Sequence, residues 1–229
     1  MVYLLDKDII GFPDPHLADE DDGLLAIGGD LTPEWLLTAY SHGIFPWFSY
    51  KDQPICWHCP QDRFVIFPDE IHISHSIRQL INKGLYKITF NKAFNEVIEG
   101  CGKAQGRNEM VGAWLGGKMI PAYKKLHELG YAASVEVWSK DKNGDVQPAD
   151  GLVGGLYGVT IGKNFFGESM FSLAPSASKL ALIALATAMQ SVGGIIDCQF
   201  ETPHLLSMGG RHILYDEYME IITNKHNKL

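Results

Sequence analysis

Short apolar runs of strand length alternate with longer segments of helical periodicity from residue 62 towards the C-terminus. Runs of about four to eight apolar and β-branched residues between turn residues indicate strands, whereas apolar positions three or four apart indicate helices. The pattern predicts strands over 63–67, 86–91, 131–139, 152–161, 165–172 and 195–200. It predicts helices over 74–84, 92–103, 121–130 and 176–194, and the last of these is apolar nearly all round, hence buried.

The first 61 residues have a different pattern, rich in loops and with one clear helix. Thr32 is a typical N-cap for this helix, and Gly43 is placed to end it. The aromatic-rich stretch 45–48 follows directly, and such a group either packs in a core or lines a pocket. We therefore expect an α+β protein in which residues 1–61 form a small N-terminal domain and residues 62–229 a larger domain with a mixed sheet.

Two predicted strands contain carboxylates that interrupt an apolar run. Side chains alternate across a strand, so Asp197 and Gln199 are expected on one face of 195–200. Glu168 interrupts 165–172 in the same way, and alternation places it on one face with Phe166 and Met170. Both strands border the buried helix 176–194, so we expect them to be neighbours in one sheet. A buried carboxylate is costly unless it is paired or used, and these residues therefore mark a candidate site.

The hairpin, buried helix and strand of the larger domain are also the layout of the acetyltransferase superfamily. Those enzymes hold the pyrophosphate of acetyl-CoA on backbone N–H groups of a glycine-rich turn that begins the helix. Here the turn is "SLAPSASKLA", which has no glycine and in which Pro175 removes a donor. We expect an acetyltransferase-like (GNAT-like) domain without a CoA site.

Composition and charge limit the classes of partner. The net charge of −8 argues against general affinity for nucleic acid, but residues 51–130 carry 11 Lys and Arg against 8 Asp and Glu. A mildly basic middle of the chain can meet phosphates, although ordinary solvated surface explains the same charges. No apolar run has the length of a membrane span, and the N-terminus lacks the basic flank of a signal peptide. We expect a cytoplasmic monomer with no membrane partner.

The cysteines and common catalytic motifs exclude several chemistries. Cys56 and Cys59 form one C-x-x-C, but a structural zinc site needs a second pair of ligands, so no metal is expected. Pro54 and Pro60 flank this pair and predict a loop in place of the helix start of a thioredoxin-like motif. No G-x-S-x-G elbow, Walker motif or dinucleotide-binding glycine pattern is present.

Eight motifs follow one another along the chain: "GLLAIGGDL", "AYSHGIFPWF", "NKAFNEVIEGC", "AYKKLHELGYAASVEVW", "LVGGLYGV", "FGESMFS", "ASKLAL" and "IDCQ". Together they resemble the leucyl/phenylalanyl-tRNA–protein transferase family, and the match extends from about residue 12 to residue 209. The resemblance implies transfer of Leu or Phe, and of Met as a third substrate, from aminoacyl-tRNA to the N-terminal Arg or Lys of acceptor proteins. The added residue then marks the acceptor for degradation. It also implies an acetyltransferase-like C-terminal domain that uses no metal, CoA or other cofactor.

The resemblance implies a catalytic role for Asp197, Gln199 and Glu168. The carboxylates of Asp197 and Glu168 would attract the positively charged acceptor. A neutral amide is a weak base, so we expect Asp197 to accept the amine proton, directly or through water, and Gln199 to orient a substrate. Water, Gln199 and the ribose hydroxyl of the departing tRNA remain alternatives. Further residues are expected to bind the aminoacyl end: Tyr40, Trp47 and Trp114 around the terminal adenosine, and Ser169, Met170 and Phe171 around the amino-acid side chain.

The basic middle of the chain supplies the residues expected to contact tRNA phosphates, namely Arg63, Arg78, Lys83 and Lys87. Two other functions use similar features. A small-molecule N-acetyltransferase would have the same fold class, and a non-catalytic module could bind basic N-terminal residues in the same acidic pocket. Transfer of labelled Phe from Phe-tRNA to a peptide that begins with Arg distinguishes the three.

Overall fold

The fold is known from a computed structural model, which describes residues 2–47, 54–105, 115, 117–140 and 151–223. The strands form two sheets, and the chain passes from one to the other between His58 and Asp62. The first sheet has the order β1 (Tyr3–Leu5), β2 (Leu24–Gly28), β4 (Cys56–His58), β3 (Phe45–Trp47). The second has the order β11 (Arg211–Leu214), β5 (Asp62–Ile66), β10 (Ile196–Asp197), β9 (Asn164–Ser172), β8 (Leu152–Ile161), β7 (Ala132–Ser139), β6 (Tyr86–Phe90).

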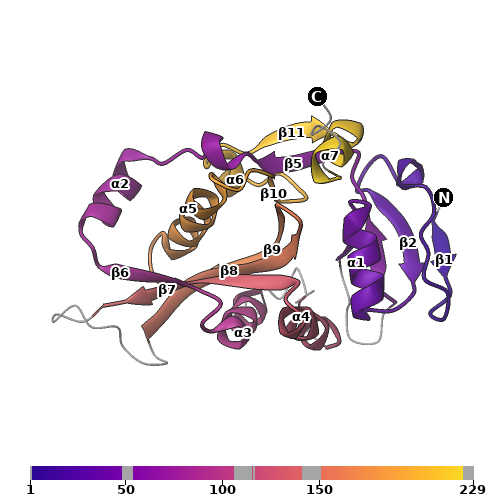
Figure 1. Ribbon diagram of the computed structural model, residues 1–229, viewed down its shortest axis with the longest axis horizontal. Coiled ribbons are helices and arrows are strands. Elements are labelled where there is room, and N and C mark those ends of the chain that lie inside the picture. Colours follow the sequence, from indigo (N-terminus) through magenta and orange to yellow (C-terminus); the bar gives the residue numbers. More distant parts are fainter. Residues whose placement is uncertain (1, 48–53, 106–114, 116, 141–150, 224–229) are drawn as a thin grey trace.

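The helices lie around these sheets (Figure 1). They are α1 (Pro33–Ser41), α2 (His75–Asn82), α3 (Phe94–Gln105), α4 (Met119–Glu128), α5 (Ala177–Met189), α6 (Pro203–Leu206) and α7 (Tyr215–Ile222), with short 3₁₀ turns η1 (Pro15–Leu17) and η2 (Pro68–Glu70). The periodicity predicted α1 to α5 and β5 to β10 at these places, but not the strands of the first sheet, β11, α6 or α7. Thr32 caps α1 by accepting from the Trp35 N–H. No helix within the described ranges is long and apolar enough to cross a membrane.

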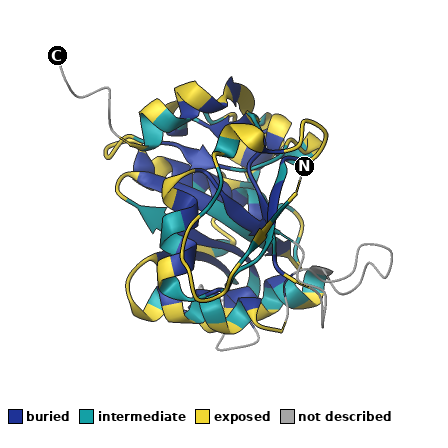
Figure 2. Cartoon of the chain, turned by 90° about the vertical axis from the view of Figure 1, so that its right-hand side faces the viewer, coloured by how far each residue is buried: buried dark blue, intermediate teal, exposed yellow. Residues whose placement is uncertain are grey.

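The larger sheet separates two apolar cores. Helix α5 packs on one face, where Leu180 and Leu185 meet Phe165 and Ile196. Helices α3 and α4 cover the other face, and their core continues without a break into the first sheet and α1. Buried residues accordingly follow the strands through the middle of the molecule (Figure 2). Because one core joins both sheets, α1 and α4 hold residues from the two parts of the chain in contact.

The larger sheet is mixed, as predicted, because β10 pairs parallel to β9 while the other pairs in it are antiparallel. Helix α5 is the crossover between these two strands, and Asp197 lies opposite Phe166. The prediction that the two carboxylate-bearing strands are neighbours is therefore confirmed. The expected division into domains at residue 61 and the expected monomeric state stay predictions.

The predicted alternation along 165–172 is wrong at one position. Gly167 and Ser169 pair with the consecutive residues Gly158 and Tyr157, which leaves Glu168 as the extra residue of a β-bulge. A bulge interrupts the alternation of side chains, and bulges occur often beside active sites. After it, Phe171 packs in the same core as Phe166, whereas Met170 packs on the α5 side.

The predicted strand 195–200 is also shorter than expected, because β10 ends at Asp197. Gln199 has a φ of 58°, a left-handed conformation that a strand cannot contain. The expectation that Asp197 and Gln199 share one strand face is therefore wrong. The pair is brought together by a turn, and the geometry of that turn shapes the candidate site.

Candidate active site

Glu168 accepts hydrogen bonds from two buried tyrosines of different helices. The Tyr40 hydroxyl, from α1, lies 2.6 Å from Oε1, and the Tyr123 hydroxyl, from α4, lies 2.7 Å from Oε2. The two hydroxyl oxygens are themselves 2.7 Å apart. The bulge in β9 directs Glu168 to this junction of the two parts of the chain, and Tyr40 and Tyr123 are 0% exposed.

Burial sets the ionisation of this cluster. It raises the pKa of Glu168 to about 7, against the opposing effect of the two tyrosine hydroxyls, while Asp197 raises the pKa further and Arg63 lowers it. Burial and the nearby Glu168 carboxylate raise the pKa values of Tyr40 and Tyr123 well above 10, so both hydroxyls stay protonated. Glu168 is thus the group of the cluster that gains and loses a proton near neutral pH.

The three oxygen–oxygen contacts among Tyr40, Tyr123 and Glu168 need three protons to be three hydrogen bonds, but only two protons are present when Glu168 is ionised. With Glu168 ionised, the two hydroxyl protons serve the two bonds to the carboxylate, and the contact between Tyr40 and Tyr123 has none. A protonated Glu168 adds the third proton, and each contact then becomes a hydrogen bond in a closed ring. The geometry can therefore accommodate a protonated Glu168, whereas with Glu168 ionised both hydroxyls donate to the carboxylate and lower its pKa.

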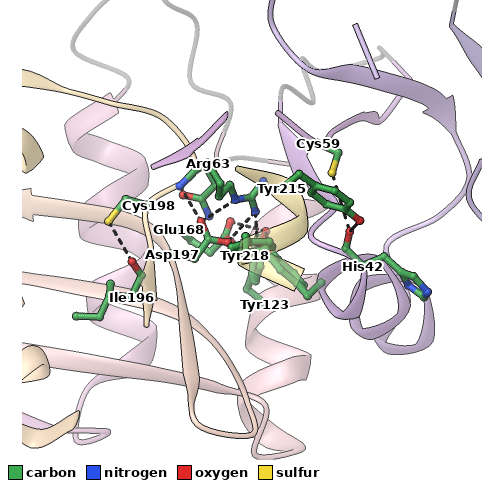
Figure 3. A network of polar contacts seen from close by, with 12 residues as sticks. His42, Cys59, Arg63, Tyr123, Glu168, Ile196, Asp197, Cys198, Tyr215 and Tyr218 are labelled. Atoms are coloured by element: carbon green, nitrogen blue, oxygen red, sulfur yellow. Dashed lines mark hydrogen bonds and ion pairs between the residues drawn. The ribbon is translucent and has the colours of Figure 1, made fainter. Parts of the chain in front are cut away.

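Asp197 has a different environment, in which four donors surround a carboxylate that is 0% exposed (Figure 3). Arg63 donates from Nε to Oδ1 at 2.9 Å and from Nη2 to Oδ2 at 2.7 Å. The Tyr218 hydroxyl donates to Oδ2 at 2.8 Å, and the backbone N–H of Gln199 donates to Oδ1 at 2.9 Å. Each oxygen accepts two hydrogen bonds, so the carboxylate has little capacity left for a further hydrogen bond.

Arg63 requires a correction. It was predicted to contact tRNA phosphates, but its side chain is 0% exposed and its guanidinium lies 4.7 Å from the Phe45 ring centre and 4.9 Å from that of Tyr218. A buried carboxylate needs a buried partner, and Arg63 on the neighbouring β5 supplies it for Asp197. The arginine at the start of an apolar strand was the signal for this ion pair.

Gln199 lies at the centre of a tight turn that directly follows Asp197. Its φ is 58°, and the Phe200 N–H donates to the Cys198 carbonyl at 2.7 Å across it. The Gln199 carbonyl accepts from the Phe64 N–H at 3.3 Å, and its own N–H bonds Asp197. Backbone in this region is strained for a residue with a Cβ, so it persists only where its surroundings hold it.

A cavity of about 530 Å³ opens where β10 turns away from β9. Glu168 and Gln199 contribute polar groups to its wall, and most of the remaining lining is apolar. The predicted residues Ser169, Met170 and Phe171 all line it. Further lining residues that the sequence did not indicate are Leu156, Leu182, Leu185, Ile196, Thr202 and His204. An apolar cavity with a few convergent polar groups is the usual form of a small-molecule site.

The other predicted substrate contacts are distributed as follows. Trp47 packs against Phe200, the neighbour of Gln199, with ring centres 4.7 Å apart, and against His58 at 5.3 Å. Trp114 lies outside the described residues. Arg78, on α2, Lys83, at the end of α2, and Lys87, on β6, are exposed near the β6 edge of the larger sheet, the edge opposite β11. Among the described residues, no group of three or more His, Cys, Asp or Glu side chains is arranged to hold a metal ion.

Comparison with known proteins identifies the family. A family model described as "Leucyl/phenylalanyl-tRNA protein transferase" matches residues 65–223, and the model of its N-terminal domain matches residues 29–61. The chain belongs to the leucyl/phenylalanyl-tRNA–protein transferase family. It is therefore an aminoacyltransferase, as the resemblance of its motifs implied.

Curated relatives with this name match nearly the whole chain. The relative from Hydrogenovibrio crunogenus is 45% identical over 99% of this chain and 85% of its own length. Those from Stutzerimonas stutzeri and Flavobacterium johnsoniae are each 47% identical, over 97% and 98% of this chain and 94% and 100% of their own lengths.

A solved structure, titled "The structure of L-PGS from Bacillus licheniformis", is 14% identical with a TM-score of 0.40 over 80% of this chain and 57% of its own. This likeness is too low to establish the acetyltransferase-like fold, which stays a prediction.

Tyr123, Tyr218 and the pairing of Arg63 were not predicted from the sequence. Tyr123 lies within the helical motif "AYKKLHELG" and Tyr218 within the final helix, where a tyrosine is ordinary core composition. Only the packing of α4 and α7 against the sheets brings their hydroxyls to the two carboxylates.

Proposed function

We propose that this chain transfers Leu or Phe, and Met as a third substrate, from aminoacyl-tRNA to proteins that begin with Arg or Lys. The proposal rests on family membership and on one structural observation: Glu168, with a pKa of about 7, lines an apolar cavity that Gln199 also lines. The transfer requires an acceptor for the amine proton and a pocket for an apolar side chain, and the cavity combines both.

The reaction joins the acceptor amine to the aminoacyl ester. The amine nitrogen attacks the ester carbonyl, the new C–N bond forms, and the C–O bond to the terminal ribose breaks. The amine loses a proton and the departing ribose hydroxyl gains one. We assign Glu168 to take this proton and return it to the ribose oxygen, because its pKa lies near the operating pH.

This assignment differs from the role first expected of Asp197. The Asp197 carboxylate already accepts four hydrogen bonds, two of them from a buried guanidinium, and it does not line the cavity. Protonating it would break the pairing of Arg63, which has no other acidic partner among the described ion pairs. We propose instead that Asp197 holds the turn from which Gln199 contacts the substrate.

Substrate selectivity follows from the rest of the cavity wall. Met170, Leu182 and Ile196 form an apolar surface suited to an unbranched Cβ with an apolar end. Such a pocket distinguishes side chains that differ by one methylene by only about 1–3 kcal/mol, so acceptance of Leu, Phe and Met together is expected. Trp47, which packs on Phe200, is proposed to stack on the terminal adenine.

The acceptor is proposed to be chosen by charge. A peptide that begins with Arg or Lys carries two positive charges, on its side chain and its α-ammonium group. Glu168 is among the residues that line the cavity, and residues 1–50 carry nine Asp and Glu against one Lys. The added Leu or Phe would then act as an N-terminal degradation signal, with the reaction in the cytoplasm. Arg78, Lys83 and Lys87 remain candidates for phosphate contacts because they are exposed.

The decisive assay measures label transfer. The protein is incubated with Phe-tRNA labelled in Phe and with matched peptides that begin with Arg, with N-acetyl-Arg or with Glu. The proposal predicts labelled product only from the peptide with a free N-terminal Arg. Transfer of label from acetyl-CoA but not from Phe-tRNA would indicate an acetyltransferase, and peptide binding without transfer would indicate a non-catalytic module.

A further inference from the structure

We propose that Arg63 and Tyr218 are positioning residues that hold Gln199 in its active conformation through Asp197. This inference rests on the proposed transfer reaction and extends it to two residues that do not line the cavity. Neither side chain is exposed, and each donates a hydrogen bond to the carboxylate of Asp197.

The first step of the argument concerns the backbone. Gln199 is one of three non-glycine residues with positive φ among those described, with Asn91 and Ser176. Asn tolerates this conformation better than Gln, and Ser176 lies in the turn before α5, outside the strand pair. A left-handed Gln at a cavity wall needs specific support, and the Asp197 carboxylate accepts its N–H.

The second step concerns what holds Asp197. Arg63 is on β5, Asp197 on β10 and Tyr218 on α7, so the unit joins three elements that are distant in the sequence. The bidentate arginine sets the plane of the carboxylate, since both Nε and Nη2 donate to it. Tyr218 bonds Oδ2, and its ring lies against the guanidinium, 4.9 Å from centre to Cζ. With these donors in place, Oδ1 is directed at the Gln199 N–H.

The third step concerns the cost of the arrangement. Burying an ion pair is rarely the most stable use of a core position, and apolar residues of similar volume often stabilise a protein as well or better. A role in fixing one conformation of Gln199 explains why Arg63, Asp197 and Tyr218 occupy the core between the two sheets. Gly43 supports the same junction, because a Cβ there would lie 2.8 Å from the Tyr218 ring.

The test replaces Tyr218 by phenylalanine, which removes the hydroxyl and keeps the ring over Arg63. Tyr215→Phe is the matched control, since that hydroxyl, on the same helix, bonds the His42 carbonyl and not Asp197. Two quantities are measured in both variants and in the wild type: hydrogen exchange at the Gln199 amide by NMR, and the single-turnover rate of Phe transfer at saturating Phe-tRNA across pH. Arg63→Lys is a second, more disruptive variant, because it keeps the positive charge but loses the paired hydrogen bonds from Nε and Nη2 to Asp197.

In Tyr218→Phe, Gln199 exchange is expected to rise about tenfold and the single-turnover rate to fall about tenfold, as for loss of one hydrogen bond to a charged group. The acidic limb of the pH profile, where the single-turnover rate falls as pH decreases, is expected not to move. Tyr215→Phe is expected to match the wild type. An unchanged rate or unchanged exchange would overturn the proposal. An acidic limb shifted to higher pH would also overturn it, by showing that Asp197 itself takes the proton. A wild type without transfer would refute the proposed reaction instead, and the exchange measurement would still test the turn.

Discussion

The raised pKa of Glu168 predicts a pH-dependent stability that Glu168→Gln removes. Burial raises this pKa from 4.5 to about 7, so ionising the group opposes folding. The contribution of protonated Glu168 to the free energy of unfolding is complete below pH 4.5 and is lost as pH rises through about 7. At about 1.36 kcal/mol per pH unit, the full loss is about 3 kcal/mol, an upper figure because the carboxylate borders the cavity.

About 2 kcal/mol of this loss falls between about pH 5.5 and pH 8.5. Urea unfolding of the wild type and of Glu168→Gln at these two pH values gives the difference directly. We expect the variant to gain stability relative to the wild type as pH rises. Glu99→Gln is the control: Lys124 lowers the pKa of Glu99 by hydrogen bonding, so its contribution is constant over this range. A stability difference for Glu168→Gln that is the same at both pH values would refute the assignment.

Three further predictions concern transfer and binding. Tyr123→Phe removes a hydroxyl that donates to the Glu168 carboxylate and lowers its pKa, so the acidic limb of the transfer rate should move to higher pH; a shift to lower pH would contradict this effect of the hydroxyl. Trp47→Ala should weaken binding of an aminoacyl-adenosine analogue about tenfold in calorimetry, with Trp47→Phe intermediate, because stacking contributes about 1–3 kcal/mol per base; equal affinity would remove Trp47 from that site. Met170→Ala should raise the ratio of kcat/KM for Phe over Leu up to about tenfold in a competition between the two aminoacyl-tRNAs, since it widens the cavity; an unchanged ratio would place the side chain elsewhere.

Much of the fold follows from patterns within single segments. The strand and helix periods predicted β5 to β10 of the larger sheet, and Thr32 predicted the start of α1. The short strands of the first sheet and β11 were not predicted. That β9 and β10 are neighbours followed from the buried helix between them, and the structure shows that they pair in parallel. These features depend on interactions close in sequence, or on one long apolar helix that has to be covered on all sides.

The candidate site was less predictable, because its geometry lies in departures from regular structure. Alternation assigned Glu168 and Gln199 to strand faces, but a bulge moves the first and a left-handed turn moves the second. The partners of the two carboxylates come from other elements, as Tyr123 and Arg63 illustrate. Tyr123 is ordinary in its own segment, and Arg63 at the start of an apolar strand indicates a buried partner without indicating which one. Tertiary packing therefore reveals both roles.

The central claim, that Glu168 and not Asp197 takes the amine proton, is tested most directly by the pH dependence of single-turnover Phe transfer. The measurement compares the wild type with Glu168→Gln at saturating Phe-tRNA and Arg-initiated peptide. The account predicts an acidic limb with a midpoint of about 7 in the wild type, and a slow rate without that limb in the variant. A variant that keeps both a fast rate and the same limb would contradict it.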